Sequence, residues 1–195
     1  MLGTAIIAGP TADVSANAGN KPYNIENVSP DAHLAPSVGD SSSKTSSKAW
    51  HKIDGVCYNG SGKKVEGAIT RGMDVSEWQG KINWKEAKKD LDFAFVRISY
   101  GTRHLDDYYD YNMTEAEAAD VPVGTYVYSL AKTNKEALAE AQLAIRQMQG
   151  HKVSYPVAFD LEDEATLGTL TRKEISQIAL TFCDEIRKAG YTPIL

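Results

Sequence analysis

The sequence predicts an α/β protein whose parallel sheet curls towards a barrel, and two observations carry this prediction. From residue 71 onward, strand patterns alternate with helix patterns, which is typical of right-handed βαβ units. The two faces of the predicted strands also differ, since one carries small, acidic or phenolic residues and the other plain hydrophobic ones. A flat, doubly wound sheet would be apolar on both faces. The asymmetry therefore favours a barrel, with a polar lumen and an outside covered by helices.

The predicted strands show this asymmetry most clearly in the second half of the chain. In the third strand, Gly124, Tyr126 and Tyr128 alternate with hydrophobic residues, and in the fourth Asp160 and Glu162 do the same. The five strands are expected at 71–75, 93–99, 122–130, 155–161 and 191–195.

Helices are expected between these strands, and three of them begin with a capping signal. Asn83, Thr133 and Thr171 each stand three residues before a glutamate, which is the pattern of a capping box. Gly150 and Gly190 mark the ends of the last two helices. The helices are expected from 84 to about 90, from 108 to 119, from 134 to Gly150 and from 172 to Gly190.

The region before the barrel divides into a leader and a small β segment. Residues 1–48 are rich in Ser, Pro, Ala, Asn and Asp, and such a composition buries too little apolar area to offset the entropy of ordering. They are interpreted as a leader or disordered linker. The apolar run 2–8 leaves open a remnant of a secretion signal, although no Lys or Arg precedes it.

Residues 49–70 are predicted to form a small β-hairpin segment that packs against the domain formed by 71–195. Its strands are expected at 55–58 and 63–65, about a Gly-rich turn. An isolated hairpin is only marginally stable in water, so packing against the following domain is expected.

Composition and charge exclude several classes of function. The formal net charge is −5 and no basic patch stands out, so nucleic acid is not an expected partner. No stretch approaches the ~20 apolar residues of a membrane-spanning helix. Cys57 and Cys183 lack the spacing of a zinc site or of a disulfide framework, and both are expected to be unpaired.

Three acidic residues are expected to converge at one end of the sheet. Asp160 and Glu162 lie two apart on one strand and point the same way, and Asp74 occupies the corresponding carboxyl end of the first strand. Their mutual repulsion should raise at least one pKa, as a general acid near neutral pH requires. Carbohydrate cleavage uses such carboxylates. A solvated acidic loop and a Mg²⁺ or Ca²⁺ site are the alternatives, and against a metal Arg97 is expected in the same lumen as a partner for carboxylates.

Aromatic residues surround these acids in the predicted fold. Trp78, Tyr100, Tyr126 and Tyr128 all fall at or just beyond strand ends on the acidic side. Sugar rings stack on aromatic planes, so this arrangement indicates a glycan-binding cleft. An aromatic core is the alternative for each residue taken singly.

The order and spacing of these motifs resemble glycoside hydrolase family 25, the Chalaropsis-type lysozymes or N-acetylmuramidases. The similarity covers residues 71–195. The segments that carry it are Arg71-Gly72-Met73-Asp74-Val75-Ser76-Glu77-Trp78-Gln79-Gly80 with Ile82-Asn83-Trp84, Phe95-Val96-Arg97, Asp106 to Ala116, Gly124 to Tyr128, and Pro156-Val157-Ala158-Phe159-Asp160-Leu161-Glu162.

The resemblance implies an irregular TIM-like β/α barrel that cleaves the β-1,4 bond between N-acetylmuramic acid and N-acetylglucosamine in bacterial cell-wall peptidoglycan. Glu162 would be the general acid, Asp160 would assist the substrate's own acetamido group, and Asp74 would orient the pair. Trp78, Arg97, Tyr100, Tyr126 and Tyr128 would line the substrate cleft. No cofactor or metal is implied, and the protein is expected to be secreted, either extracellular or bound to the cell wall.

Two departures from the family pattern stand out. Asp120 replaces the usual glycine at a helix end, where aspartate tolerates the left-handed conformation better than most residues. The chain also ends in the fifth predicted strand, so the expected fold is a barrel truncated after about five strands, and this raises doubt about activity. A non-catalytic peptidoglycan-binding fragment and a metal-dependent barrel hydrolase remain as alternatives.

Overall fold

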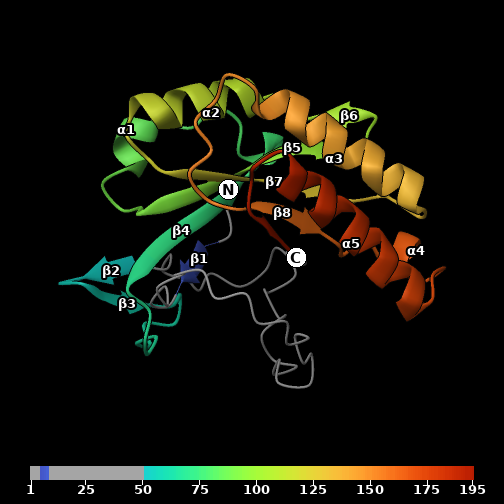
Figure 1. Ribbon diagram of the computed structural model, residues 1–195. Coiled ribbons are helices and arrows are strands. Elements are labelled where there is room, and N and C mark those ends of the chain that lie inside the picture. The colour runs from blue at the N-terminus through green and yellow to red at the C-terminus, as the bar shows by residue number, and fades with distance from the viewer. Residues whose placement is uncertain (1–4, 9–50) are drawn as a thin grey trace.

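The structure is a computed structural model that describes residues 5–8 and 51–195 (Figure 1). The rest of the expected leader, 1–4 and 9–48, lies outside the described residues.

A single mixed sheet organises the domain, and its central strands are parallel. These strands are neighbours in space in the same order as in the sequence, so each helical connection leads to the adjacent strand, as it does in a β/α barrel. The expected α/β fold with a parallel sheet is confirmed. Among the described residues the sheet does not close on itself, because β1 and β9 form its two ends. The parallel strands are β4 (Thr70–Val75), β5 (Phe93–Tyr100), β7 (Val123–Tyr128), β8 (Val157–Asp160) and β9 (Pro193–Ile194).

Two short strands extend this sheet in the antiparallel sense. β6 (His104–Leu105) pairs with the end of β5. β1 (Ala5–Ala8) pairs with β4, although its residues fall in the stretch expected to lack regular structure. The unpaired N–H and C=O groups along the edge of β4 provide the template for this pairing.

The capping signals identified in the sequence begin helices in the structure. The side chains of Asn83, Thr133 and Thr171 accept hydrogen bonds from the backbone N–H three residues later. α1 is shorter than expected, because 88–90 continue as tight turns. The helices are α1 (Trp84–Ala87), α2 (Tyr109–Ala118), α3 (Asn134–Met148), α4 (Glu164–Leu167) and α5 (Arg172–Lys188), with a 3₁₀ turn, η3 (Glu77–Gln79), after β4.

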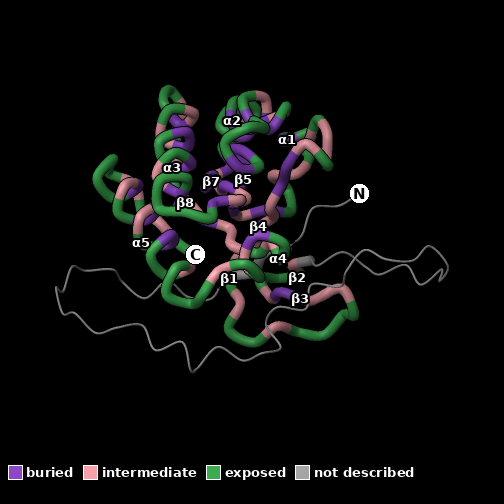
Figure 2. Tube along the Cα trace, turned by 90° about the vertical axis from the view of Figure 1, so that its right-hand side faces the viewer, coloured by how far each residue is buried: buried purple, intermediate pink, exposed green. Residues whose placement is uncertain are grey.

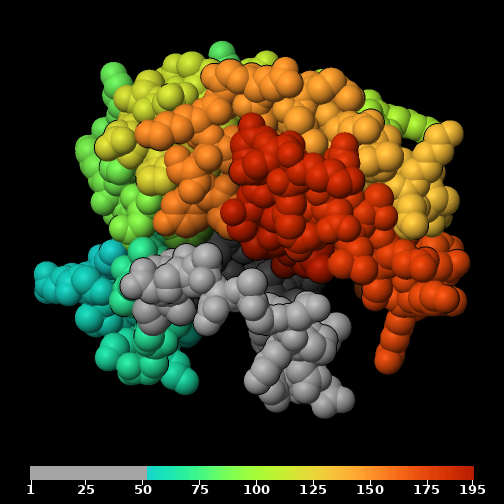
Figure 3. All heavy atoms as spheres, viewed as in Figure 1, coloured from blue at the N-terminus to red at the C-terminus, as the bar shows by residue number. Residues whose placement is uncertain are grey.

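The core lies between the sheet and the helices that cover its outer face. Buried residues follow β5 and β7 and the inward sides of α2 and α3 (Figure 2). α3 and α5 lie side by side, and in the space-filling view the atoms of α5 adjoin the segments around α3 (Figure 3). Phe159 of β8 stacks on Phe182 of α5 with ring centroids 4.0 Å apart. Burial of this apolar layer holds the strands in place.

The inner face of the sheet is filled by aromatic rings at the amino-terminal ends of its strands. Phe93 stacks on Tyr155 with centroids 4.9 Å apart, and Phe95 meets both rings edge to face. Gly124 of β7 pairs with Phe95 of β5, and a Cβ atom at Gly124 would lie 2.6 Å from the ring and 2.7 Å from the carbonyl oxygen of Pro156. This floor leaves the carboxyl ends of the strands as the open part of the inner face.

The segment before β4 forms a hairpin whose pairing differs from the expected one. β2 (His51–Ile53) pairs with β3 (Val56–Tyr58) about Asp54-Gly55, and the strand expected at 63–65 contributes one bridge, between Tyr58 and Lys64. Asp54 and Gly55 both have positive φ, which suits the two-residue turn favoured in hairpins. Lys52 Nζ forms an ion pair with Asp92 at 3.1 Å, which links the hairpin to the domain.

Three smaller expectations can be compared with the structure. Asp120 has φ of 57° and adopts the left-handed conformation at the end of α2. Cys57 and Cys183 are both buried and unpaired. Within the described residues, the helices are too short or too polar to cross a membrane.

Candidate active site at the carboxyl ends of the strands

Asp74 and Asp160 line one cavity on the inner face of the sheet. Asp74 is the next-to-last residue of β4 and Asp160 is the last residue of β8, so both stand near carboxyl ends of parallel strands. The cavity has a volume of about 260 Å³, and Phe95 and Tyr126 form part of its wall. The strand register therefore brings together two of the three expected carboxylates.

Glu162 lies two residues beyond the end of β8 and is exposed. Its charge raises the pKa of both Asp160 and Tyr128, so it belongs electrostatically to the same cluster. The three acids thus converge at one end of the sheet.

Asp160 has the clearest pKa shift among these acids. Burial, followed by the negative charges of Glu162 and Asp74, raises the pKa of Asp160 to about 6. The repulsion that the sequence predicted is therefore present, and it acts on Asp160.

Three tyrosines form the aromatic wall beside the acids. Tyr126 is half-buried next to Asp74 and Asp160, and burial raises the pKa of its phenol strongly. Tyr100 and Tyr128 are paired across β5 and β7, and their rings stack with centroids 4.8 Å apart. Burial and the charge of Glu162 raise the pKa of Tyr128 to about 12, so this phenol stays protonated and can donate a hydrogen bond at neutral pH.

Trp78 projects from the loop that follows β4 and is 71% exposed. It sits in η3, where the Ser76 hydroxyl and the Gln79 side chain form a capping box. A large apolar ring held in water on a rigid turn is suited to stacking against a ligand.

Arg97 lies on the inner face, where its charge acts on Tyr126, and it is 6% exposed. We expected it to pair with carboxylates of the lumen. Its ion pairs are with two acids from loops, Asp106 (Nε to Oδ2, 3.0 Å) and Glu77 (3.0 Å). Arg97 therefore fastens loops at the rim of the site.

The sequence reasoning assigned no role to Asp106, Glu77 and His104, which complete this network. Asp106 also accepts hydrogen bonds from the backbone N–H of Glu77 (2.8 Å) and of Tyr108 (3.0 Å). His104 Nε2 lies 2.8 Å from Glu77. Burial raises the pKa of Glu77, but the hydrogen bond from His104 and the charge of Arg97 outweigh it, so the pKa is lowered overall. One sequence signal could have identified Asp106. An aspartate can accept a hydrogen bond from the backbone N–H two residues later, as Asp106 does from Tyr108 in an Asx turn.

No group of three or more His, Cys, Asp or Glu side chains within 51–195 is arranged to hold a metal ion.

Comparison with known proteins identifies relatives of the region that carries these residues. The sequence model for glycosyl hydrolases family 25 matches residues 73–195. Lysozyme M1 of Streptomyces globisporus is 38% identical over 60 residues, which are 30% of this chain and 20% of that protein. The uncharacterized protein YegX of Escherichia coli K12 is 26% identical over 131 residues, or 64% of this chain and 46% of that one. The chain thus spans between a fifth and about half of these relatives.

Solved structures show the same fold. The autolysin LytC of Streptococcus pneumoniae, in complex with a synthetic peptidoglycan ligand, superposes with a TM-score of 0.60 at 25% identity, covering 73% of this chain and 36% of that one. A family 25 glycosyl hydrolase of Bacillus anthracis gives a TM-score of 0.55 at 24% identity, covering 64% of this chain and 58% of that one.

Proposed function

Since the chain belongs to glycosyl hydrolases family 25, we propose that it hydrolyses the β-1,4 bond between N-acetylmuramic acid and N-acetylglucosamine in peptidoglycan. The observation that carries the proposal is the cluster at the carboxyl ends of β4 and β8. There Asp74 and Asp160 share a cavity, and the charge of Glu162 acts on Asp160. We also propose that the protein acts outside the cell, at the bacterial cell wall.

In the proposed mechanism, Glu162 donates a proton to the oxygen of the leaving sugar. Its exposed position at the rim lets it reach a glycosidic oxygen that lies across the opening. Asp160, deeper in the cavity, orients the acetamido group of the substrate and stabilises the positive charge that develops when this group attacks the anomeric carbon. This differs from the scheme with a carboxylate nucleophile. Asp74 lines the same cavity and would orient the pair formed by Asp160 and Glu162.

The aromatic residues would bind the glycan. Trp78 and the stacked pair of Tyr100 and Tyr128 offer apolar faces at the opening. Tyr126 lies beside the two aspartates, where its hydroxyl can donate a hydrogen bond to a sugar or to a carboxylate. Arg97 would support this cleft through its ion pairs with Glu77 and Asp106 at the rim.

The test is to identify the new reducing end that the purified protein produces from peptidoglycan. Borohydride reduction followed by sugar analysis should yield muramitol, and a metal chelator should leave the rate unchanged. Glucosaminitol would show cleavage of the other glycosidic bond. A protein that binds peptidoglycan without releasing reducing ends would support the non-catalytic alternative, and loss of activity in chelator would support the metal-dependent one.

The proposed role of Asp160 predicts an acid limb in the pH profile. Its carboxylate must be ionised to stabilise a cationic acetamido intermediate, so kcat/KM should rise as the pH rises through about 6. Asp160→Asn should lower kcat strongly and abolish this limb.

The loss of kcat expected for Asp160→Asn would not be explained by loss of folding. A carboxyl group whose pKa is raised on folding costs stability above its ordinary pKa, so the amide variant should be at least as stable at neutral pH. If the pH profile of kcat/KM for Asp160→Asn still showed an acid limb near pH 6, the group that titrates there would not be Asp160.

A further inference from the structure

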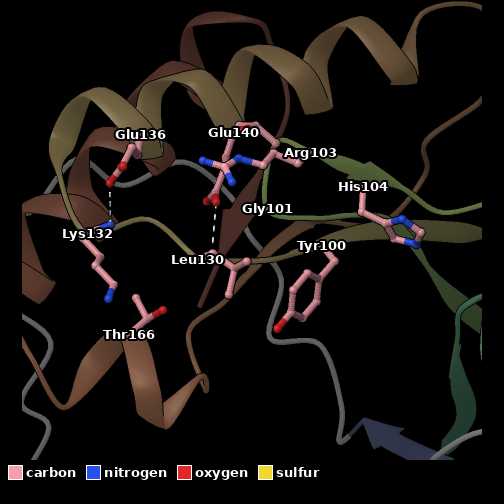
Figure 4. Close-up of a pocket in the computed structure, with 10 residues that line it drawn as sticks. Tyr100, Gly101, Arg103, His104, Leu130, Lys132, Glu136, Glu140 and Thr166 are labelled. Carbon is pink, nitrogen blue, oxygen red and sulfur yellow. Dashed lines mark hydrogen bonds between the residues drawn. The ribbon is translucent and has the colours of Figure 1, made fainter.

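A second and larger pocket lies on the same end of the sheet, beyond the aromatic wall. It has a volume of about 430 Å³ and is formed by the loops after β5 and β7 together with α3 and α4 (Figure 4). Tyr100 lines this pocket, and its ring stacks on that of Tyr128. The charge of Glu162 is one cause of the raised pKa of Tyr128. The pocket therefore adjoins the acidic cluster across one pair of rings.

The two carboxylates in this pocket are already engaged with the protein. Glu140 is 2% exposed and accepts hydrogen bonds from the Ser129 hydroxyl (2.7 Å) and the Leu130 backbone N–H (3.0 Å). Glu136 accepts from the backbone N–H of Lys132 (2.8 Å) and from the Thr133 hydroxyl (3.1 Å). Figure 4 shows the two backbone contacts as dashed lines. Both acids therefore shape the loop after β7, and neither forms an ion pair with a side-chain cation of the pocket.

Two basic side chains of the pocket, Arg103 and Lys132, form no ion pair with a described residue. Arg103 comes from the loop after β5 and Lys132 from the loop after β7, and Figure 4 shows them approaching from different sides. Among the ion pairs of residues 51–195, none involves Arg103 or Lys132. His104 instead pairs with Glu77. Two cations on separate loops are thus available to an anion that enters the pocket.

The walls that carry these cations are fixed to the strands of the acidic site. The backbone N–H of Ser129 donates to the carbonyl of Asp160 (2.9 Å), and that of Gly101 donates to the carbonyl of Tyr128 (2.8 Å). Gly101 has φ of 60° and lies against the side chain of Leu130. This contact joins the loop after β5 to the loop after β7. The pocket is therefore held in register with the carboxylates and needs little ordering when a ligand binds.

We propose that this pocket binds a carboxylate of the peptide that muramic acid carries on its lactyl group; the inference rests on the proposed function. A muramic acid at the acidic cluster projects its peptide from the sugar, and the pocket lies directly beyond the wall of that site. The volume is that of a small-ligand site and accommodates a few residues of a chain. Arg103 supplies a planar guanidinium group and Lys132 a compact ammonium group. Both can form charge-assisted hydrogen bonds with a carboxylate.

The test compares the equilibrium binding of two soluble peptidoglycan fragments, one with its peptides and one from which an amidase has removed them. The wild-type protein should bind the peptide-bearing fragment about tenfold more tightly, which corresponds to ~1.4 kcal/mol. The double variant Arg103→Gln/Lys132→Gln should lose this preference and bind the peptide-free fragment as before. The preference should also shrink as salt is added.

The matched control removes two exposed lysines elsewhere, in Lys85→Gln/Lys173→Gln. This control lowers the net charge by the same amount as the Arg103 and Lys132 variant, and it should keep the preference for the peptide-bearing fragment. The comparison therefore distinguishes binding in the pocket from general electrostatic attraction to an acidic polymer. Equal affinities of wild type for the two fragments, or an equal loss for both in the Arg103 and Lys132 variant, would overturn the proposal. The readout is affinity and not bond cleavage, so absence of muramitol in the reducing-end assay would overturn the proposed function alone.

Discussion

Replacing Glu162 by glutamine is expected to lower kcat on peptidoglycan by about 10² to 10⁴, the usual contribution of a general acid. The amide keeps the shape of the side chain and removes the proton that the leaving oxygen would receive. Because Glu162 is exposed, the substitution buries no new polar group, and the fold should be unaffected. KM should change little, since the proton is transferred in the transition state.

The neighbouring carboxylate provides the control for this experiment. Glu164 is also exposed, stands at the start of α4, and should tolerate glutamine with nearly unchanged kcat. Removing the charge of Glu162 should also lower the pKa of Asp160, because that charge is one cause of its elevation. The acid limb of any residual activity should therefore move to lower pH. Turnover near the wild-type rate in Glu162→Gln would exclude Glu162 as the proton donor.

Arg97→Ala is expected to destabilise the fold by about 3 to 5 kcal/mol, because it leaves a buried carboxylate without its counter-charge. The side chain of Asp106 is 0% exposed and would keep only its backbone hydrogen bonds. Urea unfolding followed by circular dichroism would measure the loss. The loop that carries Trp78 should also loosen, since Glu77 loses its contact with Arg97.

Two further variants separate the buried charge from the lost packing. Arg97→Ala/Asp106→Asn should recover part of the stability, because the unpaired charge is then absent. Lys52→Ala removes the more exposed ion pair with Asp92 and should cost only about 0 to 1 kcal/mol. Similar losses for Arg97→Ala and Lys52→Ala would show that the buried network contributes no more than a surface pair.

The parts of the fold that could be predicted from sequence rest on local patterns. Asn83, Thr133 and Thr171 begin helices because capping depends on residues three apart. The side-chain period of a strand is two, so the alternation around Asp160 was sufficient to place it on the inner face. The convergence of Asp74 with Asp160 followed from the rule for parallel strands.

The features that were missed depend on strand pairings and loop contacts that local sequence patterns do not determine. The pairing of β1 with β4 joins residues more than sixty positions apart, and the composition around β1 does not indicate it. In the hairpin, the chain reverses at Asp54-Gly55 and not, as expected, only at the Gly-rich segment 59–62 that follows. The ion pairs of Arg97 depend on loops whose course no periodicity describes, and the register irregularity between Arg97 and Ser99 alters the simple alternation there.

The aromatic floor of the sheet has a consequence for how this sequence can diverge. Gly124 lacks a side chain where the Phe95 ring and the Pro156 carbonyl lie within 2.7 Å of a Cβ position. A smaller residue at 95 would remove only the collision with the ring, because the carbonyl oxygen belongs to the backbone of Pro156 and stays in place. An exchange at 95 alone would leave a void, whereas any side chain at 124 would force the backbone to shift. Descendants of this gene are therefore expected to keep glycine at 124 even where residue 95 has changed.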